Sequence, residues 1–319
     1  MLSDSERAKL LYKIAIAYYE DDLSQKEVAQ KFGLSRIKIS RLLKECRESH
    51  IVDIAITAPG DPNAALERQL QSHFGLNEAI VVSSTGDDQH AMMRAIGLAA
   101  AHCLARSLQG TSVITLTWGK TLLATVEAMP RQSWPEIVVV QCLGGLGQPD
   151  ADIHGIELTQ RLARVLDGRP RLLPAPGIVK SKLVRDALLT EVQISDTLAL
   201  AARADVALLG IGVTAAPDSV VRTAKTILTE SQIQELEARG AVGDISLRFF
   251  DAQGRCVKHP INDRVVGLDL DQIRRIPRVI GVAGGPHKVE AIRGALRGKL
   301  INVLVTDEDT ATHLLATPE

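Results

Sequence analysis

The stretch from residue 24 to residue 43, SQKEVAQKFGLSRIKISRLL, predicts two short helices joined by a tight turn. Ser24, followed three residues later by Glu27, is a capping box that starts the first helix. Gly33 ends that helix, because a backbone leaving a helix commonly enters the left-handed region, where glycine carries no side-chain penalty. Ser35 then caps the second helix. This spacing restricts the first part of the chain to a small helical unit.

The second predicted helix has an apolar face and a cationic face. Ile39, Leu42 and Leu43 recur at helical spacing and predict packing against the first helix. The other positions suit a helix that lies in the major groove of DNA, with cations for phosphates and for guanine edges. The candidate DNA-binding residues are Lys31, Ser35, Arg36, Lys38, Ser40, Arg41 and Lys44.

The cationic face of such a helix often serves only to contact solvent. The local charge distinguishes this interpretation from DNA binding. Residues 31–47 contain six basic residues and one acidic residue, whereas the whole chain has a net charge of -1. This concentration of charge favours a small basic reading head on a neutral body.

The length of 319 residues exceeds what one compact core usually holds, so we expect two domains. Residues 5–20 predict a supporting helix that completes a three-helix head, and residues 51–57 (IVDIAIT) alternate like a strand that could form a small wing. Residues 58–63 (APGDPN) are rich in turn formers and predict a linker. We therefore expect a DNA-binding domain at residues 1–57 and a second domain at residues 64–319, which begins with a short helix over 64–73.

From residue 79 onward the pattern predicts strands alternating with helices, which is typical of an open, mostly parallel α/β sheet covered on both faces. The expected strands are 79–83, 112–116, 137–141, 171–174, 206–209, 279–282 and 301–305. The expected helices are 91–108, 120–129, 155–166, 181–203, 231–239, 286–297 and 308–315. Residues 247–257 predict a hairpin that turns at Gln253 and Gly254.

The four cysteines are far apart and form no pattern with metal-ligand spacing, so we expect reduced thiols and no metal. No secretory leader and no apolar run near the ~20 residues of a membrane span is present. We expect a soluble cytoplasmic protein without a cofactor or a membrane partner.

In parallel sheets small molecules bind beyond the carboxyl ends of the strands. The first candidate loop there is Thr117, Trp118, Gly119, Lys120 and Thr121, where a strand runs into a helix. Backbone N–H groups at the helix start, two threonine hydroxyls and an ammonium group would together suit a phosphate. An ordinary turn with a solvated lysine is the alternative.

Three further loops are candidates for the same ligand. Residues 144–147, with Gly145, and residues 209–212, with Gly212, permit close approach of backbone to a ligand, although each is as readily a flexible loop. Asp244, in a turn flanked by glycines, is an acceptor for sugar hydroxyls. Lys288, in the first turn of a helix begun by Pro286, is a second cation for an anion. An aspartate that caps its own turn and a surface lysine are the alternatives.

Along essentially its whole length the chain resembles the SorC family of sugar-responsive bacterial transcription regulators. The segments that carry the resemblance are the head (IAIAYYEDDLSQKEVAQKFGLSRIKISRLL), TWGKT, PAP, ADVALLGIG, GAVGDI, FFDAQG, GVAGGPHKVEAIRGAL and INVLVTDEDTA. The resemblance implies an effector domain related in fold to sugar-phosphate isomerases and deaminases, a dimer or tetramer, and operator DNA binding altered by a phosphosugar. It places phosphate binding at residues 118–121 and Lys288, and the hydroxyl acceptor at Asp244. Some relatives have glycine at the position of Thr117.

Two other interpretations compete with a ligand-responsive DNA-binding regulator. One is an isomerase or deaminase fused to a DNA head, in which Asp244 is a general base and His154, His259 or His287 an acid. No catalytic motif ties these residues together, so we expect no catalytic residues. The other is a DNA binder without a ligand, which does not account for the polar loops at the strand ends.

Overall fold

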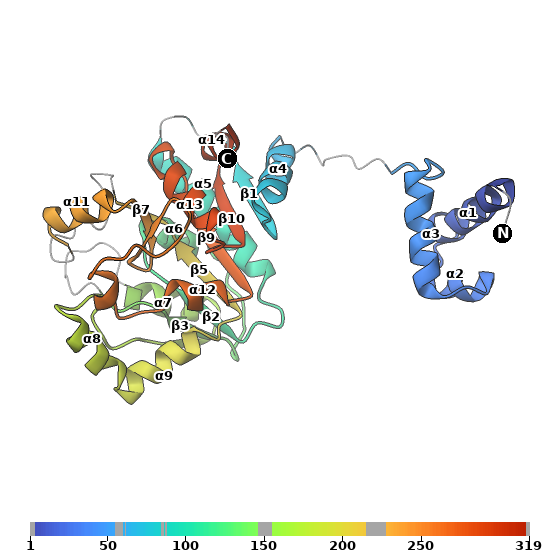
Figure 1. The fold of residues 1–319 in the computed structure, drawn as a ribbon. Helices are drawn as coiled ribbons and strands as arrows, with labels where there is room; N and C mark the ends of the chain where they lie inside the picture. Colours follow the sequence, from blue (N-terminus) through green and yellow to red (C-terminus); the bar gives the residue numbers. More distant parts are fainter. Residues whose placement is uncertain are drawn as a thin grey trace. The chain divides into compact units, whose positions relative to one another are not determined.

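The computed structural model describes residues 4–54, 60, 62–83, 86, 88–145, 155–214 and 228–316. The chain divides into two compact units, Met1–Asp61 and Pro62–Glu319 (Figure 1). Each unit buries an apolar core of its own.

Three helices make up the described part of the first unit: α1 (Asp4–Tyr19), α2 (Gln25–Phe32) and α3 (Arg36–Glu48). The predicted capping box is present, because the Ser24 amide donates to the Glu27 carboxylate at 2.8 Å and the Glu27 amide donates to the Ser24 hydroxyl at 3.3 Å. Gly33 ends α2 with φ at 66°, as predicted. The Ser35 hydroxyl accepts from the Lys38 amide at 3.2 Å and so caps α3.

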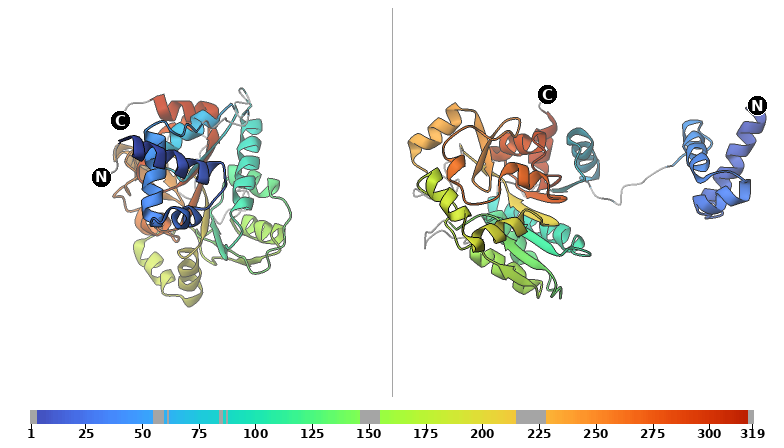
Figure 2. Two further views of the ribbon diagram at one scale, coloured as in Figure 1. Left: turned by 90° about the vertical axis from the view of Figure 1, so that its right-hand side faces the viewer. Right: turned by 60° about the horizontal axis from the view of Figure 1, so that its bottom comes forward.

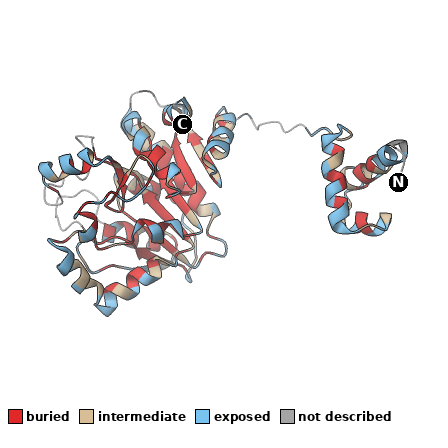
Figure 3. Ribbon diagram, in the orientation of Figure 1, coloured by how far each residue is buried: buried red, intermediate tan, exposed pale blue. Residues whose placement is uncertain are grey.

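The inner faces of the three helices form the core of this unit, and their outer faces are exposed (Figure 3). Ile39, Leu42 and Leu43 are buried, as their spacing predicts. Around them lie Leu11, Ile14, Ala15, Ala17, Val28, Ala29 and Cys46. Fully burying each large aliphatic side chain contributes roughly 1.5–3 kcal/mol, which gives this small unit its stability.

The predicted wing strand is wrong over its described part, residues 51–54, which contain no strand. The amides of Ile51 and Val52 donate to the Cys46 carbonyl at 2.9 and 3.1 Å. These two N–H groups therefore bind a free carbonyl at the end of α3 and are not available for pairing with a strand. Residues 55–57 lie outside the described residues.

Seven parallel strands form the main sheet of the second unit. They are β1 (Glu78–Val82), β2 (Val113–Leu116), β3 (Val138–Gln141), β4 (Arg169–Arg171), β5 (Val206–Gly210), β9 (Arg278–Val282) and β10 (Val303–Asp307). Their order across the sheet is β1-β10-β9-β5-β2-β3-β4. The predicted α/β class with a mostly parallel sheet is thus confirmed.

Helices cover both faces of this sheet (Figures 1 and 2). One face packs on α5 (Gln89–Arg106), α6 (Lys120–Ala128) and α7 (Gly155–Val165). The other packs on α4 (Ala64–Phe74), α9 (Val192–Ala201), α12 (Leu270–Arg274), α13 (Val289–Arg297) and α14 (Glu308–Ala316). Alternate strand residues point to opposite faces, so that Ala79 and Val81 join one core while Ile80 and Val82 join the other.

A second, antiparallel sheet, β6-β7-β8, was not predicted. It consists of β6 (Gly212–Val213), β7 (Ala241–Ile245) and β8 (Arg248–Asp251), and α11 (Glu230–Ala238) precedes β7. Asp244 therefore lies in a strand, and its prediction as a turn residue is wrong. Gly243 serves close packing, because a side chain there would meet Ala291 Cβ at 2.6 Å.

The predicted hairpin over 247–257 is partly correct. A turn at Gly254 brings Phe250 opposite Cys256, but the longer pairing of β8 is with β7, through a turn at Ser246 and Leu247. Two other boundaries differ. Strand β4 ends at Arg171, since the Leu173 amide donates to the Gln141 side chain at 3.2 Å. The helix expected over 181–203 is two helices, α8 (Lys182–Leu189) and α9.

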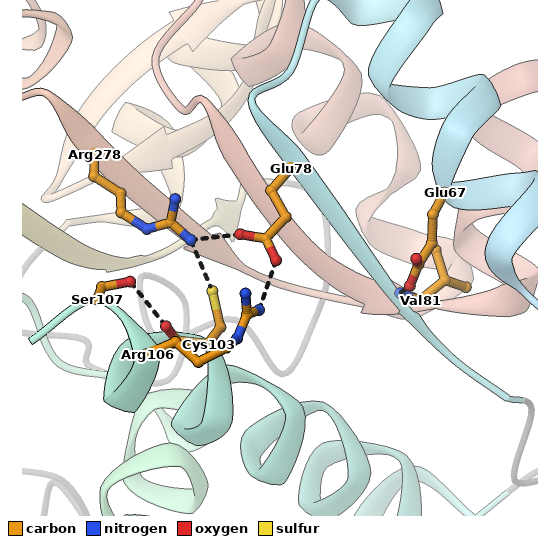
Figure 4. Close-up of polar contacts among 7 residues, drawn as sticks. All are labelled: Glu67, Glu78, Val81, Cys103, Arg106, Ser107 and Arg278. Carbon is orange, nitrogen blue, oxygen red and sulfur yellow. Dashed lines mark hydrogen bonds and ion pairs between the residues drawn. The ribbon is translucent and has the colours of Figure 1, made fainter. Parts of the chain in front are cut away.

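At the amino-terminal edge of the sheet, Glu78 joins β1, α5 and β9 (Figure 4). Its carboxylate accepts from Arg106 and from Arg278, each at 2.5 Å, and Arg278 also donates to the Cys103 sulfur at 3.4 Å. Burial raises the pKa of Glu78, but the two guanidinium hydrogen bonds lower it more, so the pKa lies below its usual value. This ionic cluster fastens the edge opposite the carboxyl ends of the strands.

Candidate functional site

A cavity of about 250 Å³ lies at the carboxyl ends of the central strands of the main sheet. The chain leaves β2 toward β3 and β4 and returns at β5 on the other side of β2, which is the crossing point where α/β sheets open a crevice. The polar side chains that line the cavity are Gln89, His90, Thr117, Lys120, Thr121, Asp244, Ser246, His287 and Lys288. Met92, Met93, Trp118, Leu122, Leu143, Ile211, Val213, Leu247 and Val282 supply its apolar lining.

The start of α6 supplies hydrogen-bond donors and positive charge to one part of the cavity. Gly119 precedes the helix with φ at 153°, a conformation that favours glycine, and it offers no side-chain cap. The first N–H groups of α6 therefore remain available to a ligand. Lys120 is exposed beside them and forms no ion pair with any described residue. Together these groups provide donors and positive charge for a phosphate.

Thr117 and Trp118 connect this helix to β2. The Thr117 hydroxyl accepts from the Gly210 amide at 3.4 Å and so ties the end of β2 to the end of β5. Trp118 also lines the cavity, and its Nε1 is buried and has no hydrogen-bond partner among the described residues. Both predicted residues are thus at the cavity, and Thr117 also has a structural task.

Asp244 is the buried acid of the cavity, with 7% of its surface exposed. Burial raises the pKa of Asp244 to about 6, although the hydrogen bond from the Leu247 amide and the charge of Lys288 oppose the rise. Gly212, on the neighbouring strand, leaves room for the carboxylate, since a Cβ there would lie 2.1 Å from Oδ1. An ionised carboxylate in this position can accept hydrogen bonds from ligand hydroxyls.

Lys288 lies in a 3₁₀ turn (Pro286–Lys288) that precedes α13, and both it and His287 line the cavity. The buried Asp307 positions this loop, because its carboxylate accepts from the Gly285 amide at 2.8 Å. A side chain at Gly284 would meet the same carboxylate at 2.2 Å. The loop therefore depends on glycine at 284 and on aspartate at 307.

Some predicted residues lie elsewhere. Gly145 does not line the cavity, and its amide donates to the Ala175 carbonyl at 3.0 Å. His259 is also absent from the lining and contacts Glu235 at 3.2 Å. Residues 146–147 and His154 lie outside the described residues.

Sequence reasoning missed several residues of the cavity wall. Ser246 and Leu247 form the turn of the β7-β8 hairpin and have φ of 56° and 58°. Ser246 is 5% exposed, and its hydroxyl is buried. No glycine or asparagine marks this turn in the sequence. The acid at 307, in contrast, follows a clear strand and begins a helix, a signal that could have identified it.

In the first unit, α3 presents the predicted DNA-binding side chains to solvent. Arg36, Lys38, Ser40 and Arg41 are exposed, and the three cations form no ion pair with a described residue. The other two predicted cations form exposed pairs, Lys31 with Asp21 at 3.3 Å and Lys44 with Glu48 at 3.6 Å. Such pairs are weak and exchange readily with phosphate contacts.

No cluster of histidine, cysteine, aspartate or glutamate among the described residues could hold a metal ion. None of the described helices has the length and the apolar character needed to cross a membrane.

The chain is similar to known proteins in both sequence and fold. A family model described as "Putative sugar-binding domain" matches residues 61–316. The chain is 34% identical to the sorbitol operon regulator of Klebsiella pneumoniae over 98% of this chain and 100% of the relative. It is 31% identical to the deoxyribonucleoside regulator of Bacillus subtilis over 98% and 99% of the two chains.

The crystal structure of the full-length sorbitol operon regulator SorC from Klebsiella pneumoniae superposes with a TM-score of 0.75, at 33% identity over 98% of this chain and 100% of that chain. Both units of the chain are therefore similar to this regulator, in sequence and in fold. The chain belongs to the SorC family of transcription regulators.

Proposed function

We propose that this transcription regulator binds operator DNA through α3 and that a phosphorylated sugar in the cavity changes its operator affinity. One observation carries the proposal. A single cavity combines the uncapped start of α6, Lys120 and Lys288, which suit a phosphate, with the buried Asp244, which suits sugar hydroxyls. The cavity is at the small end for ligand sites, which favours a monosaccharide phosphate over an oligosaccharide.

The enzyme interpretation is weaker. The relatives are named as regulators, and His259, one of the acids considered for it, does not line the cavity. Asp244 and His287 both line it, yet a buried acceptor for a ligand hydroxyl explains Asp244 without any reaction.

One head would bury too little DNA surface to be specific, so we infer that the regulator acts as a dimer or tetramer with two heads on successive half-sites. Its place of action would be the cytoplasm, where the bacterial chromosome lies. The effector can change operator affinity only through its different affinities for the two arrangements of the protein.

The test measures operator binding by fluorescence anisotropy with and without each member of a phosphosugar panel. Thermal shift first selects the sugars that bind, since a ligand of the native state raises the melting temperature. We expect one phosphosugar to change operator affinity at least fivefold. Lys120→Ala and Lys288→Ala should each weaken binding of that sugar at least tenfold.

The matched control is Lys180→Ala, because Lys180 is exposed and is not part of the cavity lining. It should bind the sugar as the wild type does. Equal binding of the same sugar without its phosphate, or an operator affinity that no bound sugar alters, would contradict the proposal.

A further inference from the structure

Ile37 is an exposed apolar side chain on the DNA-reading helix. It is the second residue of α3, and 69% of its surface is exposed. Ile37, Arg41 and Lys44 follow one another at the i, i+4 and i+7 spacing that places side chains on one helix face. That face lies opposite the buried one, and the core of the unit is complete without Ile37.

The surroundings of Ile37 are cationic. Arg36, Lys38 and Arg41 are exposed near it, and none of them forms an ion pair with a described residue. The acids of the same helix are already engaged, Glu45 by Arg7 at 2.7 Å and Glu48 by Lys44 at 3.6 Å. A second copy of this face would therefore meet like charge, whereas a polyanion would be attracted.

A partner that suits this face is a polyanion, because the face is cationic. It must also present a small apolar group that the Ile37 side chain can reach. The major groove of DNA does so at each thymine, whose 5-methyl group is the apolar feature that apolar side chains contact there. The N-terminal residues of a reading helix are the ones that reach base edges, and Ile37 is in the first turn of α3.

We propose that Ile37 is a specificity-determining residue that contacts the 5-methyl group of one thymine in each operator half-site. This inference rests on the proposed DNA binding by α3. Arg36, Lys38 and Arg41 supply the attraction to the phosphates and to guanine edges, and Ile37 selects thymine over cytosine at its position. Burial of one methyl group corresponds to a loss of about fourfold in affinity per half-site when the methyl is removed.

The experiment uses the full chain and an operator obtained by in vitro selection. Each thymine of the operator is replaced in turn by deoxyuridine, which removes only the methyl group. We expect the wild type to lose about fourfold in affinity at one thymine of each half-site. Ile37→Ala should bind the thymine and the deoxyuridine duplexes equally at that position and keep every other difference.

Tyr12→Ala is the matched control, because Tyr12 is also an exposed apolar residue of the first unit, at 59%, but lies on α1. It should reproduce the wild-type profile. If Ile37→Ala retains every deoxyuridine penalty, or if its only effect is a changed oligomeric state in sedimentation, the inference is overturned.

Arg41→Ala separates this inference from the function on which it rests. If Arg41→Ala loses operator affinity while Ile37→Ala leaves the deoxyuridine profile unchanged, DNA reading by α3 stands and only the role of Ile37 fails. If no sequence is selected and Arg41→Ala has no effect, the proposed function itself fails. Circular dichroism should show both variants folded, because both side chains are exposed.

Discussion

Asp244 is a charged group in a place that disfavours charge. It is 7% exposed, and burial raises its pKa to about 6. At neutral pH the carboxylate is therefore ionised at a cost to the folded state. A ligand hydroxyl that donates to it would offset part of that cost, which is how a destabilising residue can serve binding.

The first prediction concerns Asp244→Asn without ligand. The folded pKa of about 6 lies above the ordinary 3.8, so the folded state holds the proton more tightly than the unfolded state and stability falls as pH rises from about 4 to 6. Asparagine keeps an acceptor for the Leu247 amide but carries no charge. The variant should be more stable than the wild type at pH 7.5, by on the order of 1–3 kcal/mol.

Thermal melts at pH 7.5 and pH 4.5 test this prediction, and the advantage of the variant should shrink at the lower pH, where the wild-type carboxyl is protonated. The same variant should bind the phosphosugar at least tenfold more weakly at pH 7.5. An advantage in melting temperature that is the same at both pH values would show that charge burial is not its cause.

The sequence identified the cavity residues whose chemistry is visible in their type and place, such as Lys120, Asp244 and Lys288. It could not identify Ser246 and Leu247, because their left-handed backbone is imposed by the pairing of β7 with β8 and not by local preference. For Gly145, in contrast, the sequence predicted a role in ligand binding that the structure does not show. A glycine after a strand suggested contact with ligand, but its backbone pairs with residues 175–177.

Helix α6 is positioned by close packing against α5. A Cβ at Gly97 of α5 would lie 2.7 Å from Ala124 Cβ and 2.8 Å from the Ala124 carbonyl carbon. Such distances require the helices to touch without an intervening side chain. Because α6 begins at the cavity, this contact positions the N–H groups that would hold the phosphate.

The second prediction is that Gly97→Ala weakens both folding and phosphosugar binding. Alanine gains up to about 1 kcal/mol in helix propensity, but the clash with backbone atoms of Ala124 cannot be relieved by a rotamer change and should cost roughly 1–3 kcal/mol. The net free energy of unfolding should therefore fall. Thermal melts and titration with the phosphosugar measure the two effects.

Gly145→Ala is the matched substitution, since a Cβ there meets nothing within 4 Å. Its stability should stay within about 0.5 kcal/mol of the wild type. If Gly97→Ala proves as stable as Gly145→Ala, the close approach of α5 and α6 does not limit the fold.

The strands of the parallel sheet were predictable because each is a buried run of Val, Ile and Leu between helices. The second sheet was not, since β6 has only two residues and β7 contains a glycine in its middle. Their pairing depends on contacts between residues some 30 positions apart, such as Gly212 with Asp244. Short strands of this kind carry too little local pattern to be recognised.

For the whole molecule, the proposal requires that an event in the cavity of the second unit alters the DNA affinity of the first. Binding of effector and binding of operator are then linked equilibria of one protein. Linkage demands that the coupling be mutual, whatever structural change transmits it.

The third prediction follows from this requirement. If the phosphosugar changes operator affinity by some factor, saturating operator must change phosphosugar affinity by the same factor and in the same direction. Isothermal titration of the phosphosugar into free protein and into the protein–operator complex gives the second factor, and anisotropy gives the first. Arg41→Ala should abolish the difference between the two titrations by preventing operator binding, while Lys13→Ala, an exposed cation of α1, should preserve it. If the titrations into free protein and into the complex give equal phosphosugar affinities, occupation of the cavity is not coupled to operator binding.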